Sequence, residues 1–128
     1  MSHFTQIKTS IRDLSTLKSV LTELDLSWEK INMPIKGYKN EISNAELIIQ
    51  QSNSIDTGFI FNDQSYELVV DESFWHQSCS IELLLKKINQ DYAIQVLDLQ
   101  LKNIGFSTIN CVKAEQGTID ITAEKFML

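Results

Sequence analysis

The stretch Thr57–Asp71, with the sequence TGFIFNDQSYELVVD, predicts a β-hairpin and decides the fold. Apolar side chains alternate along both arms, so each strand has one apolar face. These side chains are Phe59 and Phe61 in the first arm and Tyr66, Leu68 and Val70 in the second. Between the arms, Asn62–Ser65 supplies residues that tolerate turn dihedrals and hydrogen-bond their own backbone. We therefore expect an antiparallel sheet built around this hairpin.

A strand and a helix are predicted at the start of the chain. The strand spans His3–Thr9, which contains several β-favouring residues. Ser10 and Asp13 then fit the capping pattern in which side-chain oxygens bind the free amides of a helix start. Apolar residues follow at helical spacing, namely Leu14, Leu17, Val20, Leu21 and Leu24. The helix is expected to end near Asp25.

Two further strands are expected between this helix and the hairpin. The first is Trp28–Met33, and Pro34, the single proline of the chain, can stand at its end but not at its centre. A polar loop, Pro34–Asn44, follows. Ala45–Gln51 then forms a short apolar strand that leads to the hairpin.

The segment Ser73–Ser80 leads into a helical region, Ser80–Ile104, whose continuity the sequence leaves open. It forms either one long helix or two helices separated by a turn at Asn89–Asp91, with the second helix starting at Tyr92. We favour two pieces, because polar residues of weak helix propensity gather at that point. In both versions Gly105 ends the helix, since glycine adopts the left-handed conformation freely.

The chain closes with a second predicted hairpin. Strands Phe106–Ala114 and Thr118–Phe126 flank a turn at Glu115–Gly117, and the second strand alternates apolar and polar residues. Helices on one side of a mostly antiparallel sheet make an α+β two-layer sandwich. We expect a single α+β domain over residues 1–128, with a ferredoxin-like core plus an extra hairpin.

Charge and hydropathy restrict the class of protein. A net charge of −6 argues against nucleic acid as a partner, since phosphates are bound by cations. No apolar run is long enough to span a membrane, and residues 2–10 resemble mature structure, not a signal peptide. We expect an acidic, soluble protein without membrane contact. Its cysteines, Cys79 and Cys111, are expected to be reduced and buried or half-buried, the alternative being a disulfide between them.

No pattern in the chain predicts catalysis. His76 and Cys79 have ligand-like spacing, but a structural zinc site needs four donors. Asp71 and Glu72 face opposite ways in a strand, which suits a solvated strand end better than an acid/base pair. There is no glycine-rich phosphate loop and no Gly-x-Ser-x-Gly elbow. We therefore assign no catalytic residue, no metal ligand and no cofactor.

A basic and aromatic loop is the first candidate binding site. Lys36, Gly37, Tyr38 and Lys39 gather there on an otherwise acidic protein. The loop suits an anionic ligand, the acidic surface of a partner or a nucleic-acid end. The alternative is a solvated loop whose lysines balance nearby glutamates.

An aromatic segment is the second candidate. Trp75 and His76 suit an anchor at a protein interface, where aromatic residues contribute most of the binding energy. The alternative is a core tryptophan packed under the second helix.

Several stretches resemble one known family. They are residues 1–26 (MSHFTQIKTSIRDLSTLKSVLTELDL), Gly37-Tyr38, residues 65–71 (SYELVVD) and residues 88–93 (INQDYA). They are similar to the hypothetical chloroplast reading frame thirty-five family of cyanobacteria and red-algal plastids, a domain of unknown function. The similarity covers nearly the whole chain, and MSHF and INQDYA are its most specific parts.

The resemblance implies plastid coding and a location in the plastid stroma, or in the cytoplasm of a cyanobacterium. Composition points the same way, since sixteen Ile against four Ala and ten Lys against one Arg indicate an AT-rich genome. The family supplies no activity.

Our leading hypothesis is a non-enzymatic binding or adaptor module with a protein partner. The alternative is a small-molecule-binding or enzymatic α+β domain with a site near Tyr38, Trp75 and His76. The oligomeric state stays open.

Overall fold

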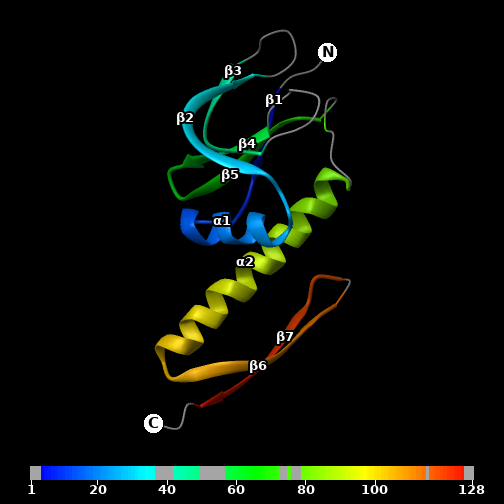
Figure 1. Cartoon of the computed structure of the whole chain (residues 1–128). Coiled ribbons are helices and arrows are strands. Elements are labelled where there is room, and N and C mark those ends of the chain that lie inside the picture. Colours follow the sequence, from blue (N-terminus) through cyan, green and yellow to red (C-terminus); the bar gives the residue numbers. More distant parts are fainter. Residues whose placement is uncertain are drawn as a thin grey trace.

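The predicted hairpin is confirmed in the computed structural model, which describes residues 4–36, 42–49, 57–72, 75, 79–114 and 116–125 (Figure 1). Strands β4 (Thr57–Asn62) and β5 (Ser65–Asp71) pair around a two-residue turn in which Asp63 has a φ of 59°. Phe59, Leu68 and Val70 are fully buried. Phe61 is 44% exposed, because it lies beside the turn, where its ring packs on that of Tyr66 at 5.1 Å.

The hairpin lies inside a five-stranded antiparallel sheet of order β1-β5-β4-β3-β2. The added strands are β1 (Phe4–Lys8), β2 (Trp28–Lys36) and β3 (Ile42–Ile49). Strand β2 continues through Pro34, three residues beyond its predicted end. It can do so because it is an edge strand, where a missing N–H leaves no ladder partner unpaired. Residues 34–36 and 42–44 of the predicted loop therefore belong to β2 and β3.

Helix α1 (Leu14–Glu23) has the expected buried face, but its cap differs from the prediction. Asp13, and not Ser10, is the N-cap, and its carboxylate accepts hydrogen bonds from the hydroxyl and the backbone N–H of Thr16 at 2.5 and 2.9 Å. Both hydrogen bonds lower the pKa of Asp13. The helix ends before Asp25, as expected, and that residue takes a φ of 58°.

Helix α2 (Ile81–Asn103) is continuous, so the prediction of a break at Asn89–Asp91 is wrong. Ser80 caps its start, with the hydroxyl accepting from the N–H of Leu83. Gly105 follows its end with a φ of 88°, as predicted. The polar residues in the middle do not end the helix, because other parts of the fold bind their side chains.

Both helices cover the same face of the five-stranded sheet (Figure 1). Leu17, Leu21 and Ile88 from the helices join Phe59 and Leu68 of the hairpin in one buried cluster. The α+β class is thereby confirmed, with helices in one layer and the sheet in the other.

The closing strands form a sheet of their own. Strands β6 (Phe106–Lys113) and β7 (Ile119–Lys125) pair as the predicted hairpin, with Gly117 in its turn at a φ of 102°. The hairpin lies along α2, on the side away from the large sheet (Figure 1). A ferredoxin-like core is not confirmed, since there the strand after the second helix would return to the first sheet.

The middle of α2 attaches the closing hairpin. Gln90 donates from Nε2 to the carbonyl oxygen of Ala114 at 3.4 Å. Asp91, which is only 8% exposed, accepts from Nζ of Lys113 at 2.5 Å. This hydrogen bond raises the pKa of Lys113, so its ammonium group stays charged at neutral pH.

Tyr92, the residue after Asp91 in α2, holds the start of α1 in place. The hydroxyl of Tyr92 accepts hydrogen bonds from the backbone N–H groups of Arg12 and Asp13, each at 3.0 Å. Ile88, one turn earlier, is fully buried in the core. One and a half turns of α2 therefore connect the sheet, α1 and the second hairpin.

Replacing Tyr92 with Phe removes the acceptor for two backbone amides and keeps the ring. We expect Tyr92→Phe to lower the free energy of unfolding by about 0.5–1.5 kcal/mol, the usual contribution of such hydrogen bonds. Urea denaturation followed by circular dichroism measures the change. An unchanged midpoint would show that the hydroxyl does not hold the start of α1.

Tyr66 makes the stability of the folded protein depend on pH. Burial, together with the hydrogen bond that its hydroxyl donates to Glu46 at 3.0 Å, raises the pKa of Tyr66 from 10.0 to about 12. The unfolded chain thus loses this proton at lower pH than the folded protein. Its stabilising effect is complete below pH 10.0 and is lost as the pH rises toward about 12. Denaturation across this range should show a steeper loss of stability in the wild type than in Tyr66→Phe.

Candidate functional site

Of the six predicted site residues, the structure describes Lys36 and Trp75. Lys36 is the last residue of β2, where its backbone pairs with Ile42. Gly37, Tyr38, Lys39 and His76 lie outside the described residues. The basic loop therefore stays a prediction.

Trp75 lies against the core and also borders a cavity. Its indole is half-buried, packs on the buried cluster and donates from Nε1 to the carbonyl oxygen of Cys79 at 2.7 Å. The cavity beside it has a volume of about 390 Å³ and runs between β1 and the start of α2. Its walls are Ile7, Glu72, Trp75, Ser80, Ile81, Glu82 and Leu85.

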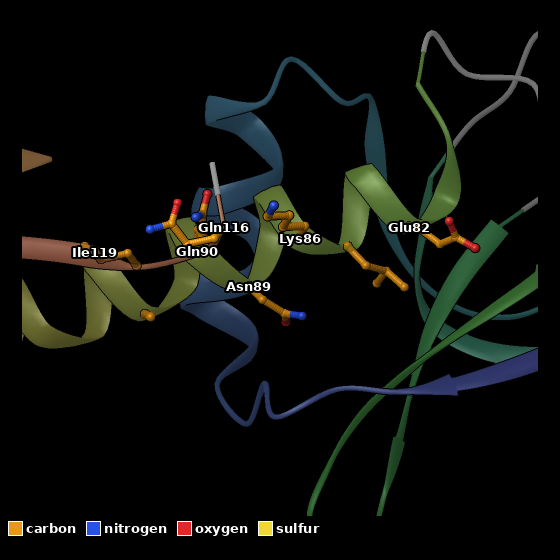
Figure 2. Close-up of a pocket in the computed structure, with 9 residues that line it drawn as sticks. Glu82, Lys86, Asn89, Gln90, Gln116 and Ile119 are labelled. Atoms are coloured by element: carbon orange, nitrogen blue, oxygen red, sulfur yellow. The ribbon is translucent and has the colours of Figure 1, made fainter. Parts of the chain in front are cut away.

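A second cavity continues along α2. It has a volume of about 620 Å³ and lies between the helix and the turn that precedes β7. Its walls are Glu82, Leu85, Lys86, Asn89, Gln90, Ala93, Gln116, Gly117 and Ile119. Figure 2 shows Glu82 at one end and Ile119 at the other.

The two cavities are neighbours along α2, since Glu82 and Leu85 border both, and we call them together the α2 trough. The helix supplies one wall because Glu82, Lys86, Asn89 and Ala93 recur at spacings of three and four residues and lie along one side. Leu85, Ala93 and Ile119 supply apolar side chains to its lining, and Asn89, Gln90 and Gln116 supply carboxamides.

The hairpin turn forms the other wall because its backbone bends back toward α2. Gly117 adopts a φ of 102° that other residues take only with strain, and its N–H donates to the carbonyl oxygen of Ala114 at 3.0 Å. Ala114 is in turn bound by Gln90. The trough therefore depends on a contact between segments that lie 24 residues apart in the sequence.

Sequence reasoning did not identify the trough. Asn89 and Gln90 were interpreted as turn formers, whereas they line its wall from within a continuous helix. One sequence pattern could have identified it. If Ser80–Ile104 is drawn as one uninterrupted helix, Glu82, Lys86 and Asn89 fall on the same side.

The opposite flank of α2 holds a polar cavity of about 400 Å³. Its walls are Glu23, Asp91, Ile94, Gln95, Asp98, Thr108, Cys111 and Lys113. The ammonium group of Lys102, 3.0 Å from Asp98, lowers the pKa of that carboxyl. Among the described residues, no three His, Cys, Asp or Glu side chains are placed to hold a metal ion.

The two cysteines and the pair Asp71 and Glu72 differ in part from what the sequence predicts. Cys79 and Cys111 are both free thiols, and Cys79 is half-buried as predicted, but Cys111 is exposed. Glu72 is exposed, whereas Asp71 is only 2% exposed, so the pair is not a solvated strand end. Within the described part of the chain, neither carboxylate oxygen of Asp71 has a hydrogen-bond partner.

Neither helix of the described ranges has the length and apolar character needed to cross a membrane.

Known proteins similar to this chain carry a common name. A protein of Guillardia theta is 38% identical over 126 residues, and one of Pyropia yezoensis is 36% identical over 126 residues. A third, from Cyanophora paradoxa, is 29% identical over the same length. Each alignment covers 98% of both chains, and each relative is named "Uncharacterized protein ycf35". No solved structure matches the chain.

These relatives are ycf35 proteins of algae, which gives the chain a plastid origin. The resemblance seen in the sequence is thus confirmed. Residues 20–122 match the family described as "Protein of unknown function (DUF1257)". The chain belongs to the DUF1257 family and, within it, to the ycf35 proteins.

Proposed function

We propose that the protein is a binding or adaptor module of the plastid stroma that holds an extended segment of a partner protein in the α2 trough. The observation that carries this proposal is that two cavities, of about 390 and 620 Å³, lie next to each other along α2 and both border Glu82 and Leu85. An open surface of this length suits an extended chain better than a compact ligand.

The dimensions suit a short peptide. The stretch Ile81–Ala93 of α2 that borders the trough rises by about 18 Å, at about 1.5 Å per residue. An extended chain covers this length with about five or six residues. The carboxamides of Asn89 and Gln116 can both donate to and accept from main-chain groups of such a segment, while Leu85 and Ile119 offer apolar contact.

Charge indicates the orientation and type of partner. Glu72 and Glu82 lie at the Trp75 end, where a basic side chain of the partner is favoured. The net charge of −6 adds a long-range attraction toward basic surfaces. The segment that fits best carries a basic residue at one end and apolar residues at the other.

The second candidate function is small-molecule binding at the Trp75 end. A volume of about 390 Å³ and an aromatic wall favour it, since ligand pockets share both properties. Such a ligand would occupy the Trp75 end and leave the Ala93 end empty.

Ala93→Trp tests the proposal by filling the far end of the trough from an exposed helical position. Tagged protein is used to purify partners from plastid extract, with quantitative mass spectrometry of the proteins recovered. The matched control is Gln100→Trp, also exposed on α2 but outside the trough. We expect Ala93→Trp to reduce recovery of the main partner at least about tenfold, or about 1.4 kcal/mol of binding free energy, because the indole occupies space that the segment needs, and the control to match wild type.

Circular dichroism first confirms that both variants are folded. Equal recovery with both variants would contradict docking in the trough. A bound small molecule in native mass spectra of both variants, without a protein partner, would instead support the second candidate.

A further inference from the structure

The closing hairpin contributes no buried residue to the part of the chain that the structure describes. Every position of β6 and β7 is half-buried or exposed, whereas Phe59, Leu68 and Val70 of the other hairpin are fully buried. Ile109 and Val112 are 56% and 51% exposed, although both are large apolar residues. Segments with little buried apolar surface open at a lower free energy than the core beside them. The closing hairpin therefore lacks the main contribution that holds the large sheet together.

The contact between this hairpin and α2 has open space on both sides. Two hydrogen bonds join the hairpin to adjacent residues of α2, one from Lys113 to Asp91 and one from Gln90 to Ala114. The larger cavity of the α2 trough, of about 620 Å³, lies on one side of this contact. The polar cavity of about 400 Å³ lies on the other. Protein cores are close-packed, so an interface with cavities on both flanks resists separation less than a core does.

The connection between α2 and β6 has the properties of a hinge. Gly105 joins them at a φ of 88°, and beyond its chain neighbours no atom of the described residues lies within 4 Å of the place where its Cβ would stand. Ile104, just before it, is 67% exposed. Glycine changes its backbone dihedrals at little cost, and hinges consist of a few such positions at the ends of elements. Both strands would move together, because β6 and β7 are paired with each other.

We propose that the closing hairpin is a movable wall of the α2 trough, which turns away from α2 as a unit at Gly105 and is held closed by the ion pair of Asp91 and Lys113. Asp91 is buried, whereas the side chain of Lys113 is 49% exposed. Glu23 of α1 attracts the same ammonium group. Ile119 moves with the strands, so opening removes one side of the trough.

This regulation rests on the proposed function, since a movable wall matters only if the trough holds a partner segment. A segment that binds the closed form alone stabilises that form by mass action. The coupling is reciprocal, so whatever opens the hairpin also weakens binding of the segment. Occupancy of the trough therefore closes the hairpin, and opening releases the segment.

Cleavage by thermolysin, which cuts before large aliphatic residues, measures the opening. The bond before Ile121 reports on the closing hairpin and the bond before Leu68 on the large sheet. Both bonds follow an acidic residue, so they are comparable substrates once unfolded. A released two-stranded hairpin is marginally stable in water, and its cleavage follows the population of the open form. In wild type, mass spectrometry of chains cut once should show cleavage before Ile121 at least about tenfold faster than before Leu68.

Lys113→Met tests the ion pair, with Lys125→Met as its matched control. Both substitutions remove one positive charge from the closing hairpin, and Lys125 is exposed at the end of β7. Lys113→Met leaves Asp91 buried without its cation. We therefore expect it to speed cleavage before Ile121 at least about tenfold, and the control to change that rate less than about twofold. An unchanged rate before Leu68 shows that each variant is folded.

The main partner, once purified, tests the coupling to the trough. At about ten times its dissociation constant it should slow cleavage before Ile121 about tenfold and leave the bond before Leu68 unchanged. Equal rates at the two bonds of wild type, or a control that opens as readily as Lys113→Met, would overturn the movable wall. A saturating partner that does not slow cleavage would overturn its link to the trough. Failure of the proposed function is distinguishable, since it appears as equal partner recovery with Ala93→Trp, and cleavage of the free protein does not depend on it.

Discussion

The fold depends on one short stretch of α2, in which neighbouring side chains bind different parts of the molecule. Ile88 fills the core, Asp91 holds Lys113 of the closing hairpin, and Tyr92 accepts two amides from the chain before α1. A helix presents successive residues about 100° apart, so a single turn can face three directions. The continuous helix makes all three contacts at once, and these contacts stabilise it through the polar stretch at Asn89–Asp91.

This stretch coincides with INQDYA, one of the two most specific parts of the resemblance to the chloroplast reading frame family. Its residues have structural partners: Gln90 binds a backbone carbonyl and Asp91 an ammonium group. The side chain that points away from these contacts, Asn89, lines the α2 trough. The same turn therefore holds the fold together and contributes to the surface to which we assign binding.

Local patterns predicted most of the secondary structure, because they are set by neighbours in the chain. Alternation along Ser65–Asp71 follows from the two-sided geometry of a strand, and Gly105 and Gly117 adopt the positive φ values that their positions required. The interruption expected at Asn89–Asp91 was wrong for the opposite reason. Weak propensity was outweighed by contacts with Ala114 and Lys113, which are more than twenty residues away. The trough was unpredictable on the same ground, since Ala93 and Ile119 meet only after the hairpin has folded back on α2.

The hydroxyl of Tyr92 has one more consequence. Arg12 and Asp13 precede α1, so the helix ladder itself does not protect their amide protons, yet both are bound to a side chain about eighty residues further along. Their exchange with deuterated solvent requires these two hydrogen bonds to open. The exchange rates of the two protons thus report how often the start of α1 leaves the Tyr92 hydroxyl in the intact protein.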